Sequence, residues 1–243
     1  MIASRTVKHY VLLTLVLLLP GFVGGVCNVP QPRLVCAEYF ASKAVVEATL
    51  IKVKAVRDLS DSEGVEAFVY TLRSNHVIRG NVTPVFRVYE GNDSGRATFA
   101  WKVGEKYVLF LFPSNEDKSA WSLDGCGNSG LLANAKLTLR QIRAIQAGRG
   151  AGVIHGIVAE QTSEVSVSGL RIEVRGGHAN YIGTTDATGH FELKVPPGKY
   201  TILPANNAVS LHTADFSYEN PDNLQVQPGG CVQVQLVATG RTP

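Results

Sequence analysis

The second half of the chain carries short runs in which apolar and polar residues alternate. In residues 190–195 every second residue is apolar, starting at Phe191, and residues 199–203 repeat the pattern. A period of two is typical of a strand with one buried face. Together with residues 184–185, these runs predict an antiparallel meander of three strands. Such a meander needs a second sheet to cover its apolar face.

Turn residues separate these runs. Asp186 and Gly189 enclose the first turn, in which the Asp186 carboxylate is placed to accept a backbone N–H two residues on, and Gly189 supplies a positive φ. Pro197 and Gly198 form the second turn. We assign these four residues a structural role, because Asp186 has only Thr188 as an oxygen-bearing neighbour and a calcium loop needs several such ligands.

The C-terminal region contains about eight short strands and no helix. A β-sandwich is the fold that this density of strands and turns favours. The predicted strands are residues 153–159, 170–174, 181–185, 190–195, 199–203, 210–216, 224–226 and 231–237.

The preceding region is also rich in strands. In residues 44–56 the apolar alternation changes phase after Leu50, which indicates one long strand with a bulge. Residues 106–112 are almost entirely apolar, so this strand is expected to be buried on both faces. The other predicted strands are residues 65–72, 84–89, 97–101 and 121–123, with residues 76–80 as a connection.

One segment has helical spacing, residues 137–147. Thr138 with Gln141 forms a capping-box pattern at its start. The glycine-rich residues 148–152 then predict a linker. The chain is therefore divided into residues 1–25, a domain at 26–147, the linker at 148–152 and a second domain at 153–243.

The N-terminus has the form of a secretory signal peptide. Basic residues precede the apolar run 10–19, which a Pro-Gly pair ends before small residues at 23–25. The run is shorter than a membrane-spanning helix requires, which argues against an uncleaved anchor. The rest of the chain has no second transmembrane candidate, so no stable span is expected after cleavage of residues 1–25. A secreted, periplasmic or cell-surface location follows.

Export makes the four cysteines disulfide candidates. Cys27, Cys36, Cys126 and Cys231 allow two bridges in three arrangements, and their spacing does not suit a zinc ribbon. Two N-glycosylation sequons, at Asn81 and Asn92, matter only in a host that glycosylates exported proteins.

Neither the net charge nor any sequence motif indicates an enzymatic reaction. The formal charge is +3, and without residues 1–25 the basic count falls from 23 to 21 against 20 acids, so nucleic acid is not an expected partner. No H-x-x-x-H, G-x-S-x-G or phosphate-binding loop occurs. We predict no catalytic residue, metal or cofactor, and we assign Trp101 and Trp121 to the core.

The pattern VIHGIVA, LRIEV and TTDATGHFELKVPPGKYTI in residues 151–238 resembles the carboxypeptidase regulatory-like domain, a transthyretin-like (prealbumin-type) sandwich. The resemblance implies the fold of an accessory module in exported proteins and says almost nothing about activity.

Residues 27–147 resemble the netrin-like module of the tissue inhibitors of metalloproteinases, an OB-type barrel. The resemblance is carried by Cys27 and Cys36, the long strand after them, the run VGEKYVL at 103–109, and Cys126. It implies a Cys27–Cys126 bridge, with Cys36–Cys126 as the second choice. Cys231, at the start of a predicted strand, is expected to be a buried free thiol. The chain departs from the family because Gly25 stands where the zinc-chelating first cysteine is expected.

The sequence thus predicts an all-β protein, with an OB-type barrel and one helix followed by a prealbumin-like β-sandwich. We expect an exported, non-enzymatic two-domain binding or scaffold protein that presents loops to a protein or glycan partner. The alternative is a metalloprotease inhibitor that acts through the Cys27 edge.

Overall fold

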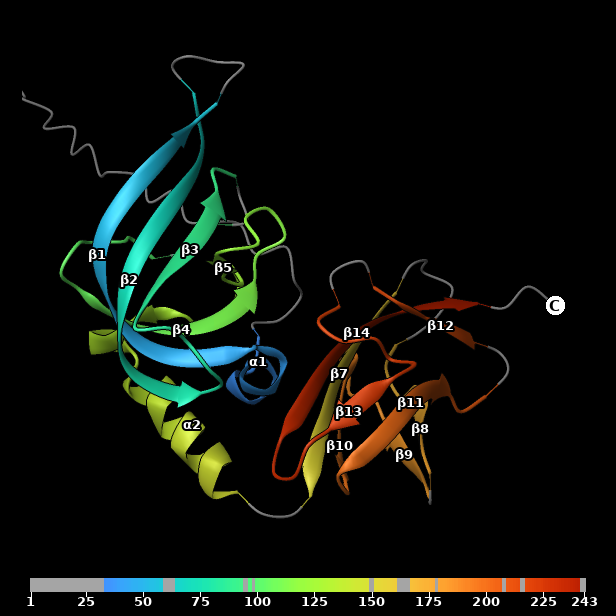
Figure 1. Cartoon of the computed structure of the whole chain (residues 1–243). Helices are drawn as coiled ribbons and strands as arrows, with labels where there is room; N and C mark the ends of the chain where they lie inside the picture. Colours follow the sequence, from blue (N-terminus) through green and yellow to red (C-terminus); the bar gives the residue numbers. More distant parts are fainter. Residues whose placement is uncertain are drawn as a thin grey trace, which may run out of the picture.

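The protein is all-β, with two strand-rich modules lying beside one another (Figure 1). The computed structural model describes residues 33–58, 64–93, 96–97, 99–148, 151–160, 167–177, 179–206, 209–214 and 217–240. The expected fold class is confirmed. No helix within these ranges is long and apolar enough to cross a membrane.

The first module is one six-stranded sheet in the order β1-β2-β3-β5-β4-β6, with an additional β1–β4 pairing that closes it into a barrel-like ring. Two α-helices and a short 3-10 helix accompany it. The elements are α1 (Val35–Ala41), β1 (Ala44–Arg57), β2 (Val65–Arg79), β3 (Val85–Gly91), β4 (Lys106–Pro113), β5 (Trp121–Ser122), β6 (Gly130–Leu131), η1 (Leu132–Asn134) and α2 (Lys136–Ala147).

β1 is a single long strand, as the phase change predicted. Its register against β2 shifts between Leu50 and Lys52. Before the shift β1 also pairs with β4 and is mostly buried, whereas after it Ile51 and the residues up to Lys54 are exposed. The bulge therefore separates the barrel part of β1 from an arm that extends with β2 beyond the barrel (Figure 1).

β4 is the central strand of the first module. Its residues Tyr107 to Leu111 are all fully buried. Alternate side chains enter two cores, because Tyr107, Leu109 and Leu111 contact the barrel interior while Val108 and Phe110 pack under the helices. The prediction of a strand buried on both faces is confirmed.

Three local expectations for this module were wrong. β2 continues through residues 76–79, which were assigned to a connection. The described residues of segment 97–101 form no strand. Thr138 lies inside α2, which begins at Lys136 after an Ala135 N-cap that makes no side-chain hydrogen bond, so the capping box is not used. In addition α1 was not predicted at all.

The second module consists of two four-stranded sheets with orders β10-β7-β14-β12 and β13-β11-β8-β9. One continuous apolar core joins residues from both sheets, which makes the module a sandwich. The strands are β7 (Gly152–Glu160), β8 (Arg171–Gly176), β9 (Asn180–Thr184), β10 (His190–Val195), β11 (Gly198–Pro204), β12 (Val209–Thr213), β13 (Leu224–Val226) and β14 (Cys231–Gly240).

The strands predicted around the Asp186 and Pro197 turns exist, but they do not form a meander. β10 pairs with β7 in one sheet, whereas β9 and β11 both pair with β8 in the other. The chain therefore crosses between the sheets at each of these turns. Alternation identified the buried face of each strand and carried no information about the neighbouring strand.

Candidate binding pocket and domain junction

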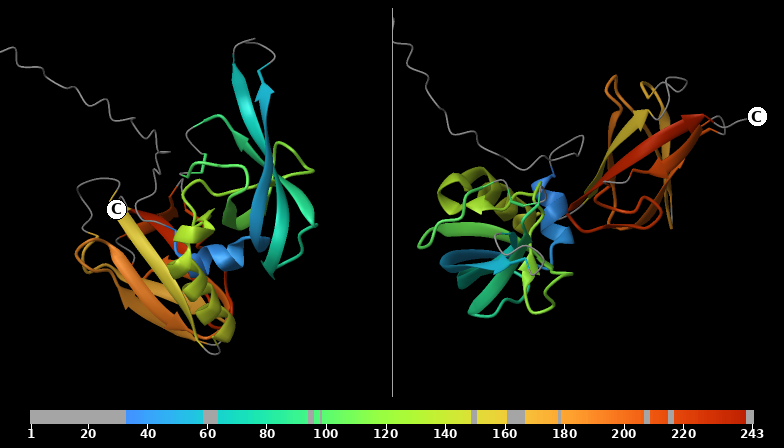
Figure 2. Two further views of the ribbon diagram at one scale, coloured as in Figure 1. Left: turned by 90° about the vertical axis from the view of Figure 1, so that its left-hand side faces the viewer. Right: turned by 90° about the horizontal axis from the view of Figure 1, so that it is seen from above.

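A disulfide joins the two modules. Cys36 in α1 is bonded to Cys231 at the start of β14, with the two Cα atoms 5.4 Å apart. α1 lies between the modules in two of the views (Figures 1 and 2). This bond corrects two expectations: Cys231 is not a free thiol, and Cys36 does not pair with Cys126. Cys126 is also disulfide-bonded. Its expected partner Cys27 lies outside the described residues. The Cys27 edge, through which the alternative inhibitor function would act, therefore lies outside them as well.

β14 begins with alternating polar and apolar residues, yet both of its faces are buried. Val232 and Val234 point into the sandwich core. Cys231, Gln233 and Gln235 share the opposite face, and all three are buried as well. Cys231 binds α1 through its sulfur, and the Gln233 Oε1 accepts a hydrogen bond from the Leu34 backbone N–H at 2.8 Å. The polar face of β14 is therefore the junction with the first module.

Arg33 connects the two modules through its guanidinium group. Its Nη1 lies 2.5 Å from the Asp124 carboxylate of the first module. The guanidinium also stacks over Phe112 of the first module, at 5.1 Å, and over Tyr218 of the second, at 4.6 Å. Because Arg33 is buried, this ion pair and these cation–π contacts are little screened by solvent.

Glu38 in α1 is a fully buried carboxylate at the same junction. Its Oε2 accepts hydrogen bonds from the backbone N–H and the side-chain amide of Asn128, at 2.6 and 2.7 Å, while its Oε1 has no partner. Burial raises the pKa of Glu38 to about 7, against the opposing effects of the Asn128 hydrogen bonds and the Arg33 charge. The junction therefore contains a group that changes charge near neutral pH.

Glycines allow the backbones of the two modules to approach closely. A side chain at Gly230 would meet the Phe40 ring at 2.6 Å, and one at Gly229 would meet the Gly148 backbone at 3.1 Å. The turn before β14 thus packs directly against α1 and the end of α2.

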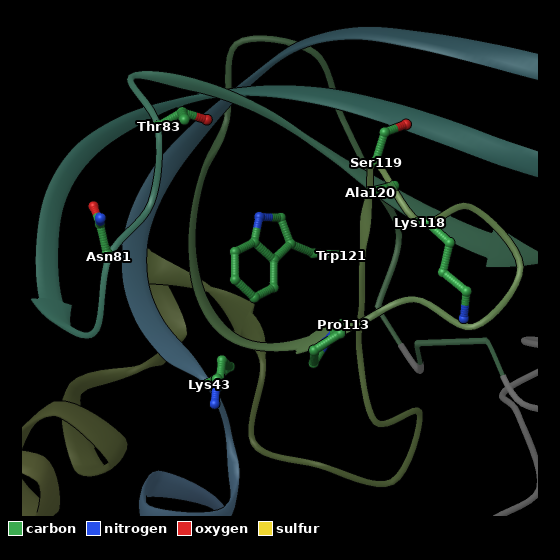
Figure 3. Close-up of a pocket in the computed structure, with 8 residues that line it drawn as sticks. All are labelled: Lys43, Asn81, Thr83, Pro113, Lys118, Ser119, Ala120 and Trp121. Carbon is green, nitrogen blue, oxygen red and sulfur yellow. The ribbon is translucent and has the colours of Figure 1, made fainter.

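A pocket of about 460 Å³ opens on the barrel (Figure 3). Four separate segments supply its walls: the residue before β1, the β2–β3 connection, the end of β4, and the loop that enters β5. The lining residues are Lys43, Asn81, Thr83, Pro113, Lys118, Ser119, Ala120 and Trp121. The indole ring of Trp121 lies in the middle of the view, surrounded by the others.

Backbone pairing fixes the position of Trp121. β5 lies between β3 and β4, with Trp121 opposite Val88 on one side and Pro113 on the other. Its indole packs partly against the barrel core. This contact agrees with the expected core role, while the indole is half-buried, also lines the pocket, and has no described residue that accepts a hydrogen bond from its Nε1.

Hydrogen bonds also order the loop before Trp121. The Asp117 carboxylate accepts the Ser119 backbone N–H at 2.9 Å and its hydroxyl at 2.5 Å, and Arg87 lies 3.5 Å from the same carboxylate. The two Ser119 hydrogen bonds hold the pKa of Asp117 below its usual value. The loop therefore presents Lys118 and Ser119 to the pocket while Asp117 is held by Arg87 and Ser119.

Trp101, in contrast, is part of the core. It stacks on Tyr70 at 4.4 Å between ring centroids and contacts Phe99 and Tyr107. Its Nε1 donates to the buried Glu90 Oε2 at 2.9 Å, and the Ala97 N–H donates to Oε1 at 3.2 Å. Burial raises the pKa of Glu90, and these hydrogen bonds oppose the shift.

The predicted turn residues lie far from this pocket, in the second module. The Asp186 Oδ1 accepts hydrogen bonds from the backbone N–H groups of Thr188 and His190, at 2.8 and 3.0 Å, and Gly189 has φ = +82°. Pro197 is an exposed bend residue and Gly198 begins β11. The turn interpretation of Asp186 and Gly189 agrees with this geometry.

None of the described histidines lines the Trp121 pocket. His155 lies 3.5 Å from Glu192, and His76 lies 4.0 Å from Glu47. Burial lowers the pKa of His155, partly offset by Glu192. Within the described ranges, no three His, Cys, Asp or Glu residues are grouped as metal ligands would be. His178 lies outside the described residues.

Sequence reasoning missed the pocket because its residues are spread over residues 43–121 and no motif links them. Only the isolated Trp121 after a polar loop gave a signal, and tryptophan is more often a core residue. The ring closure of the barrel brings these segments together.

Comparison with known proteins does not assign a family. No family model matches the chain, and no curated protein matches it. Among solved structures, the TIE protein of Bacillus anthracis matches with 10% identity over 82% of this chain and a TM-score of 0.29; the chain spans 35% of that protein. GBS52, the minor pilin of Streptococcus agalactiae, matches with 11% identity, coverage of 83% and 85%, and the same TM-score. Likeness at this level indicates neither family nor function.

Proposed function

We propose that this chain is an exported, non-enzymatic binding protein whose two β modules present loops in a fixed relative orientation to a protein or glycan partner. The observation that carries the proposal is the Cys36–Cys231 bond between α1 and β14. A disulfide between modules is of use where thiols are oxidised, outside the cytosol. Together with the N-terminal pattern of residues 1–25, it supports export.

The contacts at the junction favour a fixed orientation of the two modules over independent motion, and a fixed orientation suits a binding role. Interfaces between domains of one chain usually permit relative motion unless they are large and apolar. Here a covalent bond, the Arg33 contacts and the Leu34–Gln233 hydrogen bond all restrain the junction. Because the two surfaces are already fixed relative to one another, a partner that contacts both binds at a lower cost in conformational entropy.

The positions of the perturbed acids support a non-catalytic role. Catalytic carboxylates with raised pKa values face a substrate pocket. Glu38 is instead enclosed at the junction against Asn128. Glu90 lines a second pocket, of about 410 Å³, but both of its carboxylate oxygens already accept hydrogen bonds, from Trp101 and Ala97. These groups hold the structure together. We retain the carboxypeptidase regulatory-like interpretation for the second module as part of the proposal.

The test compares the oxidised mature chain with the Cys36→Ser/Cys231→Ser variant in binding to arrayed glycans and to proteins of the exported fraction. A partner that contacts both modules should bind the oxidised protein at least tenfold more tightly. Circular dichroism of both proteins controls for folding. Equal affinity of every partner for the two proteins, or turnover of a bound partner, would contradict the proposal.

A further inference from the structure

We propose that the pocket around Trp121 binds a sugar ring that carries an anionic group. The inference rests on the proposed binding role and narrows the glycan class for this one site. It depends on three features of the pocket: an aromatic surface, two ammonium groups and a rim of neutral polar groups.

Trp121 supplies the aromatic surface. The indole ring lies in the pocket (Figure 3), while β5 is fixed between β3 and β4. An indole combines an apolar face with one N–H donor. The apolar C–H face of a sugar ring can pack against the indole face, and a ring hydroxyl can accept a hydrogen bond from the indole N–H. Because no described residue accepts from the Trp121 Nε1, this donor remains available to a ligand.

Two lysines give the pocket its charge. Lys43 and Lys118 line the pocket from different segments, with the Lys118 side chain extending away from the indole in Figure 3, and none of the eight lining residues is acidic. Asp117 in the adjacent loop is held by Arg87 and Ser119. An ammonium group is a mobile point charge that pairs with a carboxylate or a phosphate. An anionic substituent is therefore favoured over a neutral or cationic one.

Neutral polar side chains complete the rim. Asn81 offers a side-chain amide, which can donate to and accept from sugar hydroxyls. The Thr83 hydroxyl donates to the Val85 carbonyl oxygen. The Ser119 hydroxyl donates to the Asp117 carboxylate and accepts from Arg87, so these two hydroxyl oxygens can only accept from a ligand. Gly80 has φ = +79°, and a Cβ there would lie 2.4 Å from the Lys43 carbonyl oxygen. Glycine at this position thus lets the Asn81 connection pack against the Lys43 backbone. A volume of about 460 Å³ is in the range of small-ligand sites.

The pocket is less suited to a peptide. Extended peptides commonly bind by adding a strand to an unpaired sheet edge. Both edges of Trp121 are already paired, to Val88 and to Pro113.

The test is calorimetric or NMR titration of the oxidised mature chain, made in a host without N-glycosylation because Asn81 lies in a sequon. The probes are glucuronate, glucose 6-phosphate and glucose. We expect at least one of the two anionic sugars to bind tenfold or more tightly than glucose, and their ranking distinguishes a carboxylate from a phosphate ligand.

Variants then locate the site. Trp121→Ala should weaken binding of the anionic sugar at least tenfold, with Trp121→Phe keeping most of the affinity if the fold is intact. Lys43→Met and Lys118→Met should each reduce the preference over glucose, whereas Lys54→Met, on the exposed arm, should not. Equal binding of all three sugars, no binding of any, or an unchanged affinity in both Trp121 variants would overturn the proposal.

A peptide probe with a free terminal carboxylate provides the remaining arm. If it binds at Trp121 while the sugars do not, the saccharide assignment is wrong. The role proposed for the whole chain is tested separately, because it depends on the Cys36–Cys231 bond and not on Trp121. Failure at the pocket with disulfide-dependent partner binding would leave that role standing.

Discussion

Cys36 and Cys231 are bonded to one another although 195 residues separate them in the chain. One sulfur belongs to the first helix of the first module and the other to the last strand of the second. The bond therefore closes almost the whole described chain into a loop and fixes how the two modules meet.

Removing this bond should loosen the junction and lower stability. For a loop of this length the chain-entropy model gives about 5 kcal/mol as an upper figure, since strain and separate unfolding of the modules reduce it. In the Cys36→Ser/Cys231→Ser variant we expect denaturation at lower urea concentration and a larger radius of gyration by small-angle scattering. An unchanged radius together with an unchanged midpoint would show that noncovalent contacts alone hold the modules.

Glu38 should make the folded protein less stable as pH rises. Its folded pKa of about 7 lies above the ordinary value of 4.5. The folded state thus retains a proton that the unfolded state releases, and stability falls between pH 4.5 and about 7. The contribution is roughly 3 kcal/mol. Urea denaturation at pH 5 and pH 8 measures it.

Glu38→Gln should remove this part of the pH dependence, because the amide has the shape of the protonated acid and cannot ionise. The exposed Glu160→Gln serves as the matched control and should behave as wild type. If Glu38→Gln keeps the wild-type slope between pH 5 and 8, another group is responsible. Glu219, whose pKa burial also raises, is then the next candidate.

Trp101→Phe should destabilise the protein by about 1–3 kcal/mol, because the buried Glu90 loses the hydrogen bond from the indole Nε1. Trp121→Phe is the matched control and should cost less, since no described residue accepts from its indole. Thermal denaturation of both variants makes the comparison. A larger loss at position 121 would contradict the division of the two tryptophans into core and pocket residues.

Gly189→Ala should lower stability by at least 1–2 kcal/mol, the approximate cost of a left-handed conformation for a residue with a side chain. The added Cβ would also lie 2.2 Å from the Val158 carbonyl oxygen, in the sheet that β10 joins. Gly177→Ala, where a Cβ meets nothing within 4 Å, is the control. Equal denaturation midpoints for the two variants would be incompatible with this turn geometry.

Local patterns were accurate where one strand or turn determines its own form. The bounds of β10 and β13 match the alternating runs, and the phase change in β1 marks a true bulge. Local patterns failed where contacts with another segment decide the conformation. Segment 97–101 forms no strand in its described residues, and Thr138 is not a cap.

The sequence by itself determined the all-β class, the buried faces and the Asp186–Gly189 turn, because side-chain period and backbone preference are properties of adjacent residues. Only the tertiary structure decided that β10 and β11 belong to different sheets, that Cys36 meets Cys231, and that Lys43, Asn81 and Trp121 line one pocket. Each depends on which distant segments pack together, and alternation specifies a face to be covered without specifying what covers it.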